Sequence, residues 1–154
     1  MLRLDPVLVA SRWACGDLLP ENIPQVAVGL IEAGYEHPTV YRVAAEDRIY
    51  SRDQVEPLLA RMFSALGVAY PMALKNARQT VARQIAREVM AGLKNPWSAA
   101  MQLDRIVPHW ETEDQNVWAI YGIADEVDWD SGFGRNISTL EAELIEAFTR
   151  LARS

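Results

Sequence analysis

Apolar side chains recur three and four positions apart along almost the whole of this chain, and clear apolar–polar alternation is absent. A spacing of three and four places side chains on one face of an α-helix, whereas alternation would place them on one face of a strand. The chain has 154 residues, of which 50% are hydrophobic, so one domain can bury a full core. We therefore predict an all-α fold, a single-domain bundle or orthogonal array of about seven or eight helices.

The clearest apolar stripes predict helices at about residues 54–66, 72–92, 114–127 and 139–152. Shorter helices are expected at about 6–15, 20–33, 38–46 and 97–106. The predicted inward side chains of the 72–92 and 139–152 helices are Leu74, Ala77, Val81, Ile85 and Val89, and Leu140, Leu144, Phe148 and Leu151. Asp114 can cap one helix, and Ser138 with Glu141 has the capping-box pattern at the start of the last one.

One short pattern occurs twice, beginning at Ile31 and again at Val89: a β-branched residue, Ala-Gly, and a polar residue before proline. In each copy glycine can end one helix and proline can begin the next, with His37 or Asn95 at the cap. Either the chain contains two related helical hairpins, or two helix joints meet the same geometric demand with the same residues. The hairpins would span about residues 20–46 and 72–107.

Charge is segregated along the sequence. Residues 75–94 carry five basic side chains and one acid, a balance of +4, whereas residues 104–146 carry eleven acids and two arginines, a balance of −9. Such segregation concerns partners and encounter rates rather than fold. Because the whole chain has a net charge of −6, nucleic acid is not an expected partner. The acidic third predicts a basic protein partner instead.

Two of the five tryptophans lie among the acids of this third. We predict a partner-binding surface made of Trp110, Glu111, Glu113, Asp114, Asp125, Glu126, Asp128, Trp129 and Asp130. An exposed indole ringed by carboxylates can anchor a basic partner, because Trp and Arg dominate binding hot spots. A merely solvated acidic surface is the alternative interpretation. The tryptophans at 13, 97 and 118 are expected to pack in the core or to cover a helix end.

A second class of function would use the same carboxylates for chemistry. Asp128 and Asp130 begin like a calcium loop, but Phe133 replaces the glycine at the sixth position and Thr139 the glutamate at the twelfth. His109, two residues before Glu111, has a side chain suited to acid–base work or metal binding. The alternative is therefore a metal-binding protein or hydrolase that uses the Asp125–Asp130 carboxylates and His109. We assign no catalytic residue, metal or cofactor.

The single cysteine, Cys15, excludes an intramolecular disulfide and suits a reducing compartment. It is expected to be a packed, unreactive thiol. The first residues lack the pattern of a secretory signal, and no apolar run approaches the roughly 20 residues that cross a bilayer. These features predict a cytoplasmic protein with no membrane partner, and they leave the oligomeric state open.

The helix-joint residues also carry a resemblance. They are Leu19-Pro20, Ala27, Leu30, Gly34, Pro38, Val43-Ala44-Ala45, Ala91-Gly92, Pro96, Ala99-Ala100 and Ala124-Asp125-Glu126. In these the chain resembles small all-helical bacterial proteins of unknown function, some of which accompany polymorphic or contact-dependent toxins as immunity proteins. The resemblance implies a toxin domain as partner and carries over no functional residue. The sequence thus predicts a non-catalytic intracellular protein-binding module with an acidic recognition surface, in its most concrete form an immunity or antitoxin protein.

Overall fold

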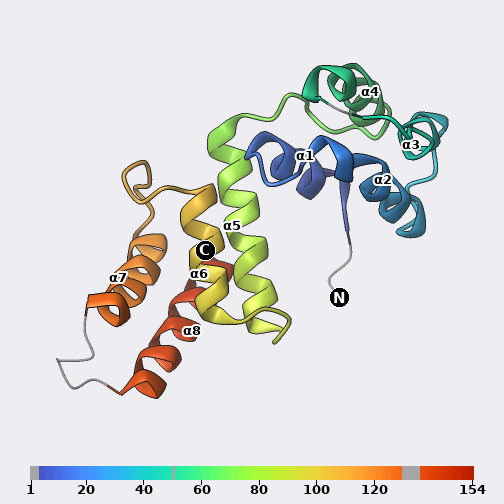
Figure 1. Cartoon of the computed structure of the whole chain (residues 1–154). Helices are drawn as coiled ribbons and strands as arrows, with labels where there is room; N and C mark the ends of the chain where they lie inside the picture. The colour runs from blue at the N-terminus through green and yellow to red at the C-terminus, as the bar shows by residue number, and fades with distance from the viewer. Residues whose placement is uncertain (1–3, 50, 130–135) are drawn as a thin grey trace. The chain divides into compact units, whose positions relative to one another are not determined.

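The computed structural model describes residues 4–49, 51–129 and 136–154, with only the backbone described at 128 and 129. Every regular element in these ranges is helical, which confirms the all-α prediction (Figure 1). The elements are α1 (Pro6–Ala14), the 3₁₀ turn η1 (Pro20–Asn22), α2 (Ile23–Glu32), α3 (Pro38–Ala44), α4 (Arg52–Ala65), α5 (Leu74–Met90), α6 (Pro96–Ile106), α7 (Gln115–Trp129) and α8 (Ile137–Arg153). The α-helix boundaries differ from those predicted by no more than two residues, except that α2 begins three residues later than predicted because residues 20–22 form η1.

The chain divides into two compact units, residues 1–80 and residues 81–154, and the division falls within α5. In the first unit α2 packs against α3, and α3 packs against α4. Its core consists of Val9, Ala10, Trp13, Leu18, Ile23, Ala27, Leu30, Val40, Val43, Val55, Leu59, Met62 and Phe63. Burial of each large side chain in this set contributes about 1.5–3 kcal/mol, so the helices are stabilised by packing of their apolar faces.

A polar network borders this core. Trp13 is only 2% exposed, and its indole N–H donates to Glu56 Oε1 over 3.1 Å. The hydroxyl of Tyr70 donates to the other carboxylate oxygen of Glu56. The guanidinium of Arg52 lies over the Trp13 ring, 3.8 Å from its centre. One carboxylate on α4 thus joins α1 to the segment between α4 and α5.

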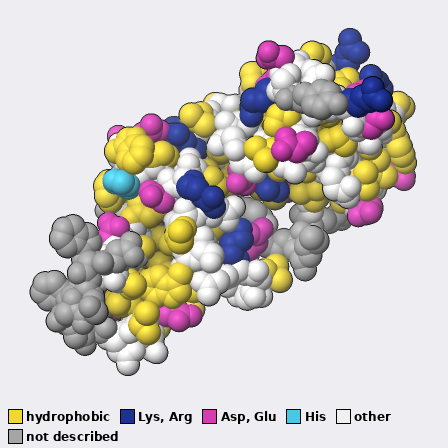
Figure 2. Space-filling model, viewed as in Figure 1, with side chains coloured by type: hydrophobic (Ala, Val, Ile, Leu, Met, Phe, Trp, Pro, Cys, Tyr) yellow, Lys and Arg dark blue, Asp and Glu magenta, His cyan; other side chains and the backbone are white. Residues whose placement is uncertain are grey.

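In the second unit α7 packs against α8, and both contact α6. The predicted inward face of α8 is confirmed, since Leu140, Leu144, Phe148 and Leu151 are all buried. Figure 2 shows hydrophobic side chains gathered on the visible surface of this unit, over α6, α7 and α8. Among the described residues of this unit, the exposed large apolar side chains are Met90, Leu93, Met101, Trp110, Trp118, Ile137 and Ile145.

Two local expectations were wrong. Leu74 is exposed, because it is the first residue of α5 and residues 73–76 all face solvent; the buried stripe of this helix begins at Ala77. Ser138 does not cap α8. The helix begins earlier than predicted, so Asn136 is the N-cap, and its side-chain oxygen accepts from the Ser138 N–H over 2.8 Å.

The two repeated joints have the predicted geometry. Gly34 and Gly92 have φ values of +99° and +72°, and Pro38 and Pro96 begin the next helices. At the caps, His37 Nδ1 accepts from Thr39 N–H, and Asn95 Oδ1 accepts from Trp97 and Ser98 N–H. The same positive-φ helix end occurs at residues 16 and 67, which lack the repeated pattern. General helix-stop chemistry is therefore sufficient to explain the joints, and the hairpin duplication remains a prediction.

Within the described ranges, none of the helices combines the length and the apolarity that a bilayer crossing requires.

Candidate functional site

The acidic loop, residues 104–114, comprises the last turn of α6 and its connection to α7. Side chains of α7 fix it from one side. The Tyr121 hydroxyl donates to the Val107 carbonyl, and Trp118 Nε1 donates to the Thr112 carbonyl over 3.0 Å. Burial raises the pKa of Tyr121 well above its usual range, with Asp104 adding to the effect, so this hydroxyl stays a donor. The loop is thereby held on the helices at two of its carbonyls.

Asp114 is the last residue of the acidic loop, and its side chain caps the start of α7, as predicted. Its Oδ1 accepts from the Asn116 N–H over 2.8 Å, and its carbonyl accepts from the Trp118 N–H. A carboxylate at this end of a helix also faces the positive end of the helix dipole. Asp114 is half-buried and has a structural role, which makes it a weaker candidate for direct partner contact than its neighbours.

Trp110 is the most prominent side chain of the acidic loop. Its side chain is 71% exposed, far more than a large aromatic usually is in a folded domain. The His109 ring meets it edge to face, at 80° with ring centroids 4.9 Å apart. His109 Nδ1 in turn lies 3.3 Å from Asp104 Oδ1. Asp104 and His109 therefore support the indole from within the loop while most of its surface stays in solvent.

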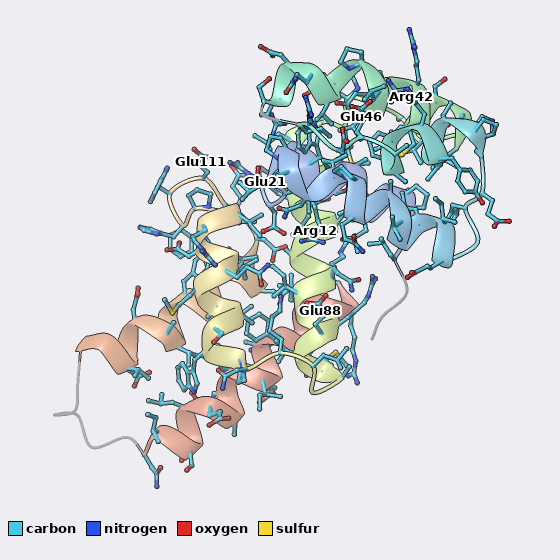
Figure 3. All side chains as sticks on the ribbon, turned by 45° about the vertical axis from the view of Figure 1, so that its right-hand side comes forward. Arg12, Glu21, Arg42, Glu46, Glu88 and Glu111 are labelled. Atoms are coloured by element: carbon cyan, nitrogen blue, oxygen red, sulfur yellow. The ribbon has the colours of Figure 1, made fainter. Side chains whose placement is uncertain are left out.

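The surroundings of Trp110 are negative. The acidic loop contains four acids and one arginine, a balance of −3. Of the acids, Asp104, Glu111 and Glu113 are exposed. Figure 3 shows Glu111 in the connection beyond α6, directed away from the helices. An exposed aromatic side chain and exposed carboxylates thus lie in one short segment, and its role as a partner-binding surface stays a prediction.

The other predicted site residues lie elsewhere. Asp125 and Glu126 are on the last turns of α7, about 16 Å along the helix from the acidic loop at 1.5 Å per residue. The side chains of Asp128 and Trp129, and Asp130 as a whole, lie outside the described residues. The structure therefore brings together the residues at 110–114 and separates them from Asp125 and Glu126.

The alternative site of His109 with the later carboxylates has no support among the described residues. His109 pairs with Asp104, not with Glu111 as its sequence position suggested. Asp125 belongs to the opposite end of α7. In the described part of the chain, no three His, Cys, Asp or Glu side chains are close enough to hold a metal ion. The His109–Asp104 pair is itself exposed, and the Tyr121 ring that His109 meets edge to face has its hydroxyl engaged by the Val107 carbonyl.

Sequence reasoning missed Asp104 and Trp118 as parts of the site. Asp104 lies in the last turn of the predicted 97–106 helix, so the end of that helix was the available signal. Trp118 is partly exposed and covers the acidic loop instead of entering the core. Trp13 is in the core, as expected, and Trp97 is half-buried.

Cys15 is not an activated thiol. Burial raises its pKa to about 11, with a smaller opposite effect from Arg78 and an additional rise from Asp17. It is therefore protonated at neutral pH, in agreement with the expected packed thiol.

The first unit contains a hollow of about 470 Å³ that is open to solvent, lined by Leu4, Arg12, Asp17, Leu18, Asn22, Gln25 and Val26. Arg12, labelled in Figure 3, pairs with Asp17 over 3.0 Å. Asn22 Oδ1 accepts from the Leu19 N–H. Arg12, Asp17 and Asn22 in this hollow are thus already engaged within the protein, which makes the acidic loop the stronger candidate site.

No family model, curated protein or solved structure matches this chain. The resemblance to small helical bacterial proteins thus remains a prediction. The geometry of the acidic loop suits non-covalent recognition, because it combines a supported, exposed indole with fixed negative charge.

Proposed function

We propose that this chain is a non-catalytic protein-binding module that captures a basic protein partner at the acidic loop. The observation that carries the proposal is Trp110, which is 71% exposed and supported by His109 among carboxylates. Leaving a large aromatic in water forgoes its burial, so a partner that covers it gains that free energy. For a central anchor, truncation typically costs about 2 kcal/mol or more of binding energy.

The charge of the segment favours the same kind of partner. Carboxylates around Trp110 would attract a basic surface over a distance of about one Debye length, and they would repel an acidic one. The most concrete form of the proposal is an immunity protein, since toxins that cleave nucleic acid need a basic active face. The single cysteine fits a reducing compartment, so this proposal places the module in the cytoplasm.

The anchor is tested by binding kinetics. The tagged chain is used to retain a partner from a lysate of the native host, and the rates at which the purified partner binds to and dissociates from each variant are then measured. Trp110→Ala should speed dissociation by about 30-fold, the equivalent of 2 kcal/mol. Met101→Ala is the matched control, because Met101 is an equally exposed apolar side chain, at 72%, on α6 of the same unit. Equal dissociation rates for the two variants would contradict the proposal.

The charge contribution is tested separately. Glu113→Lys should slow association several-fold and weaken its dependence on salt, because long-range attraction to the acidic loop is reduced. Glu32→Lys is the control: it makes the same change in net charge at an exposed position at the end of α2, in the other unit. An association rate that changes neither with salt concentration nor in Glu113→Lys would show that the acidic loop is a solvated surface and not an interface.

A further inference from the structure

The first unit already contains an indole, a carboxylate and a guanidinium in one group. The Arg52 guanidinium lies over the Trp13 ring at 3.8 Å from its centre. Its Nη2 is 3.6 Å from Glu56 Oε1, which also accepts from the Trp13 indole N–H. Each of the three partners therefore contacts the other two. This arrangement satisfies the guanidinium both through the aromatic face and through a carboxylate.

The acidic loop has two of these three parts. Trp110 supplies the indole, and Asp104 and Glu113 supply exposed carboxylates in the same segment. Within the described part of the chain, Trp110 has His109 as its ring neighbour and no cation over its indole. The contact of Asp104 with His109 uses one oxygen, and a carboxylate can accept about four hydrogen bonds. Arg105 belongs to the same segment, but among the described residues no guanidinium lies over the Trp110 ring. The part missing from this site is therefore a stacked guanidinium.

We infer that the Trp110 site receives an arginine side chain of the partner, with its guanidinium on the indole and paired with Asp104 or Glu113. This inference rests on the proposed function and specifies the chemistry that the site recognises. Arginine fits better than lysine because the guanidinium is planar, stacks on aromatic rings and pairs with a carboxylate through two parallel hydrogen bonds. A lysine ammonium is a more strongly hydrated point charge and would lose more on leaving water.

His109 acts here as a positioning residue. Its edge-to-face contact limits the rotation of Trp110, and the Asp104 carboxylate fixes the imidazole in turn. A side chain held in its bound orientation loses less entropy when a partner arrives. His109→Ala should therefore weaken arginine binding without removing the Arg-over-Lys preference, which belongs to Trp110 and the carboxylates.

The test uses the full chain and two capped peptides of equal charge, Gly-Arg-Gly-Arg-Gly and Gly-Lys-Gly-Lys-Gly. Indole N–H signals are followed by ¹⁵N–¹H NMR, and the Trp110 signal is identified by its loss in Trp110→Phe. The arginine peptide should shift the Trp110 signal at a concentration about fivefold lower than the lysine peptide. The buried Trp13 signal should not move. Asp104→Asn should reduce the preference, and Met101→Ala should preserve it.

Equal responses to the two peptides would overturn the inference, as would an absent Trp110 shift at millimolar peptide. The two proposals fail in distinguishable ways. A native partner that is lost in Trp110→Ala, combined with equal peptide responses, would refute the arginine site and keep the binding module. A native partner that binds Trp110→Ala normally would refute the binding module at this loop, and with it the arginine site as its recognition element.

Discussion

Replacing Glu56 with alanine tests whether the network around Trp13 stabilises the first unit. Glu56 accepts from the indole N–H of Trp13 and from the hydroxyl of Tyr70, and it pairs with Arg52. The three partners belong to α1, to the segment before α5 and to α4 itself. Loss of one carboxylate therefore affects three parts of the unit at once.

The expected cost follows from the burial of each partner. Trp13 is 2% exposed, so its N–H would have no access to water, which costs about 1–3 kcal/mol. Tyr70 is half-buried and its hydroxyl can regain water, so its bond contributes about 0.5–1 kcal/mol. The Arg52–Glu56 pair has side chains 46% and 42% exposed and contributes between about 0 and 1 kcal/mol. Glu56→Ala should thus lower the free energy of unfolding by about 1.5–5 kcal/mol.

The assay is urea unfolding followed by far-ultraviolet circular dichroism, with the slope against urea compared between variants. Glu56→Gln keeps a carbonyl oxygen as acceptor for Trp13, so it should cost no more than about 1 kcal/mol. Tyr70→Phe in both backgrounds gives a double-mutant cycle, in which the two residues should couple by about 0.5 kcal/mol or more. Glu32→Ala is the matched control, because Glu32 is exposed and should change stability by less than about 0.5 kcal/mol.

If Glu56→Ala costs no more than Glu32→Ala, the Trp13 N–H does not depend on Glu56 and the reasoning from burial is wrong. If Glu56→Gln lowers the free energy of unfolding as much as Glu56→Ala does, the stabilisation comes from the charge of Glu56 and not from its acceptor oxygen. That result would contradict the argument that most of the lost stability comes from the unsatisfied N–H of the buried Trp13 indole.

Three further predictions follow from local chemistry. Cys15, with a pKa of about 11, should react with iodoacetamide at pH 8 at least about 100-fold more slowly than in the urea-unfolded chain, because little thiolate is present; similar rates would contradict this. Asn95→Ala removes the cap of α6 and should cost about 1 kcal/mol of unfolding free energy, whereas Asn95→Ser should cost much less. Gly92→Ala should lower the melting temperature because its φ is +72°, whereas Gly122→Ala, inside α7 with open space at the Cβ position, should raise it. Shifts of the same sign would refute the backbone argument.

The helices and their joints could be predicted from the sequence because they depend on near neighbours. Spacing of three and four defines which face of a helix is apolar, so the four residues predicted to face inward on α8 are all buried, and Ala147 joins them. Glycine at positive φ and proline at the first helical position act within one turn, so the ends at Gly34 and Gly92 were also predictable. The errors at Leu74 and Ser138 lie at helix starts. There, a small shift of the first helical residue changes which side chain is buried and which residue acts as the N-cap.

The candidate site could be predicted only in part, because some of its contacts depend on residues that are not near neighbours in the sequence. Trp110 and its acidic neighbours are adjacent in sequence, so their grouping needed no tertiary knowledge. The support of Trp110 by His109 and Asp104 depends on how the loop folds back on the end of α6, and the cover that Trp118 gives the loop depends on how α7 meets it.

The same division applies to the first unit. The pattern shows that Trp13 and the apolar residues of α4 are inward, but not that Glu56 receives the indole N–H and the Tyr70 hydroxyl. Local spacing determines which side chains leave water, since that depends on helical periodicity alone. Which polar groups meet is decided by the packing of whole helices, because a buried donor bonds to whatever acceptor the neighbouring helix places within about 3 Å.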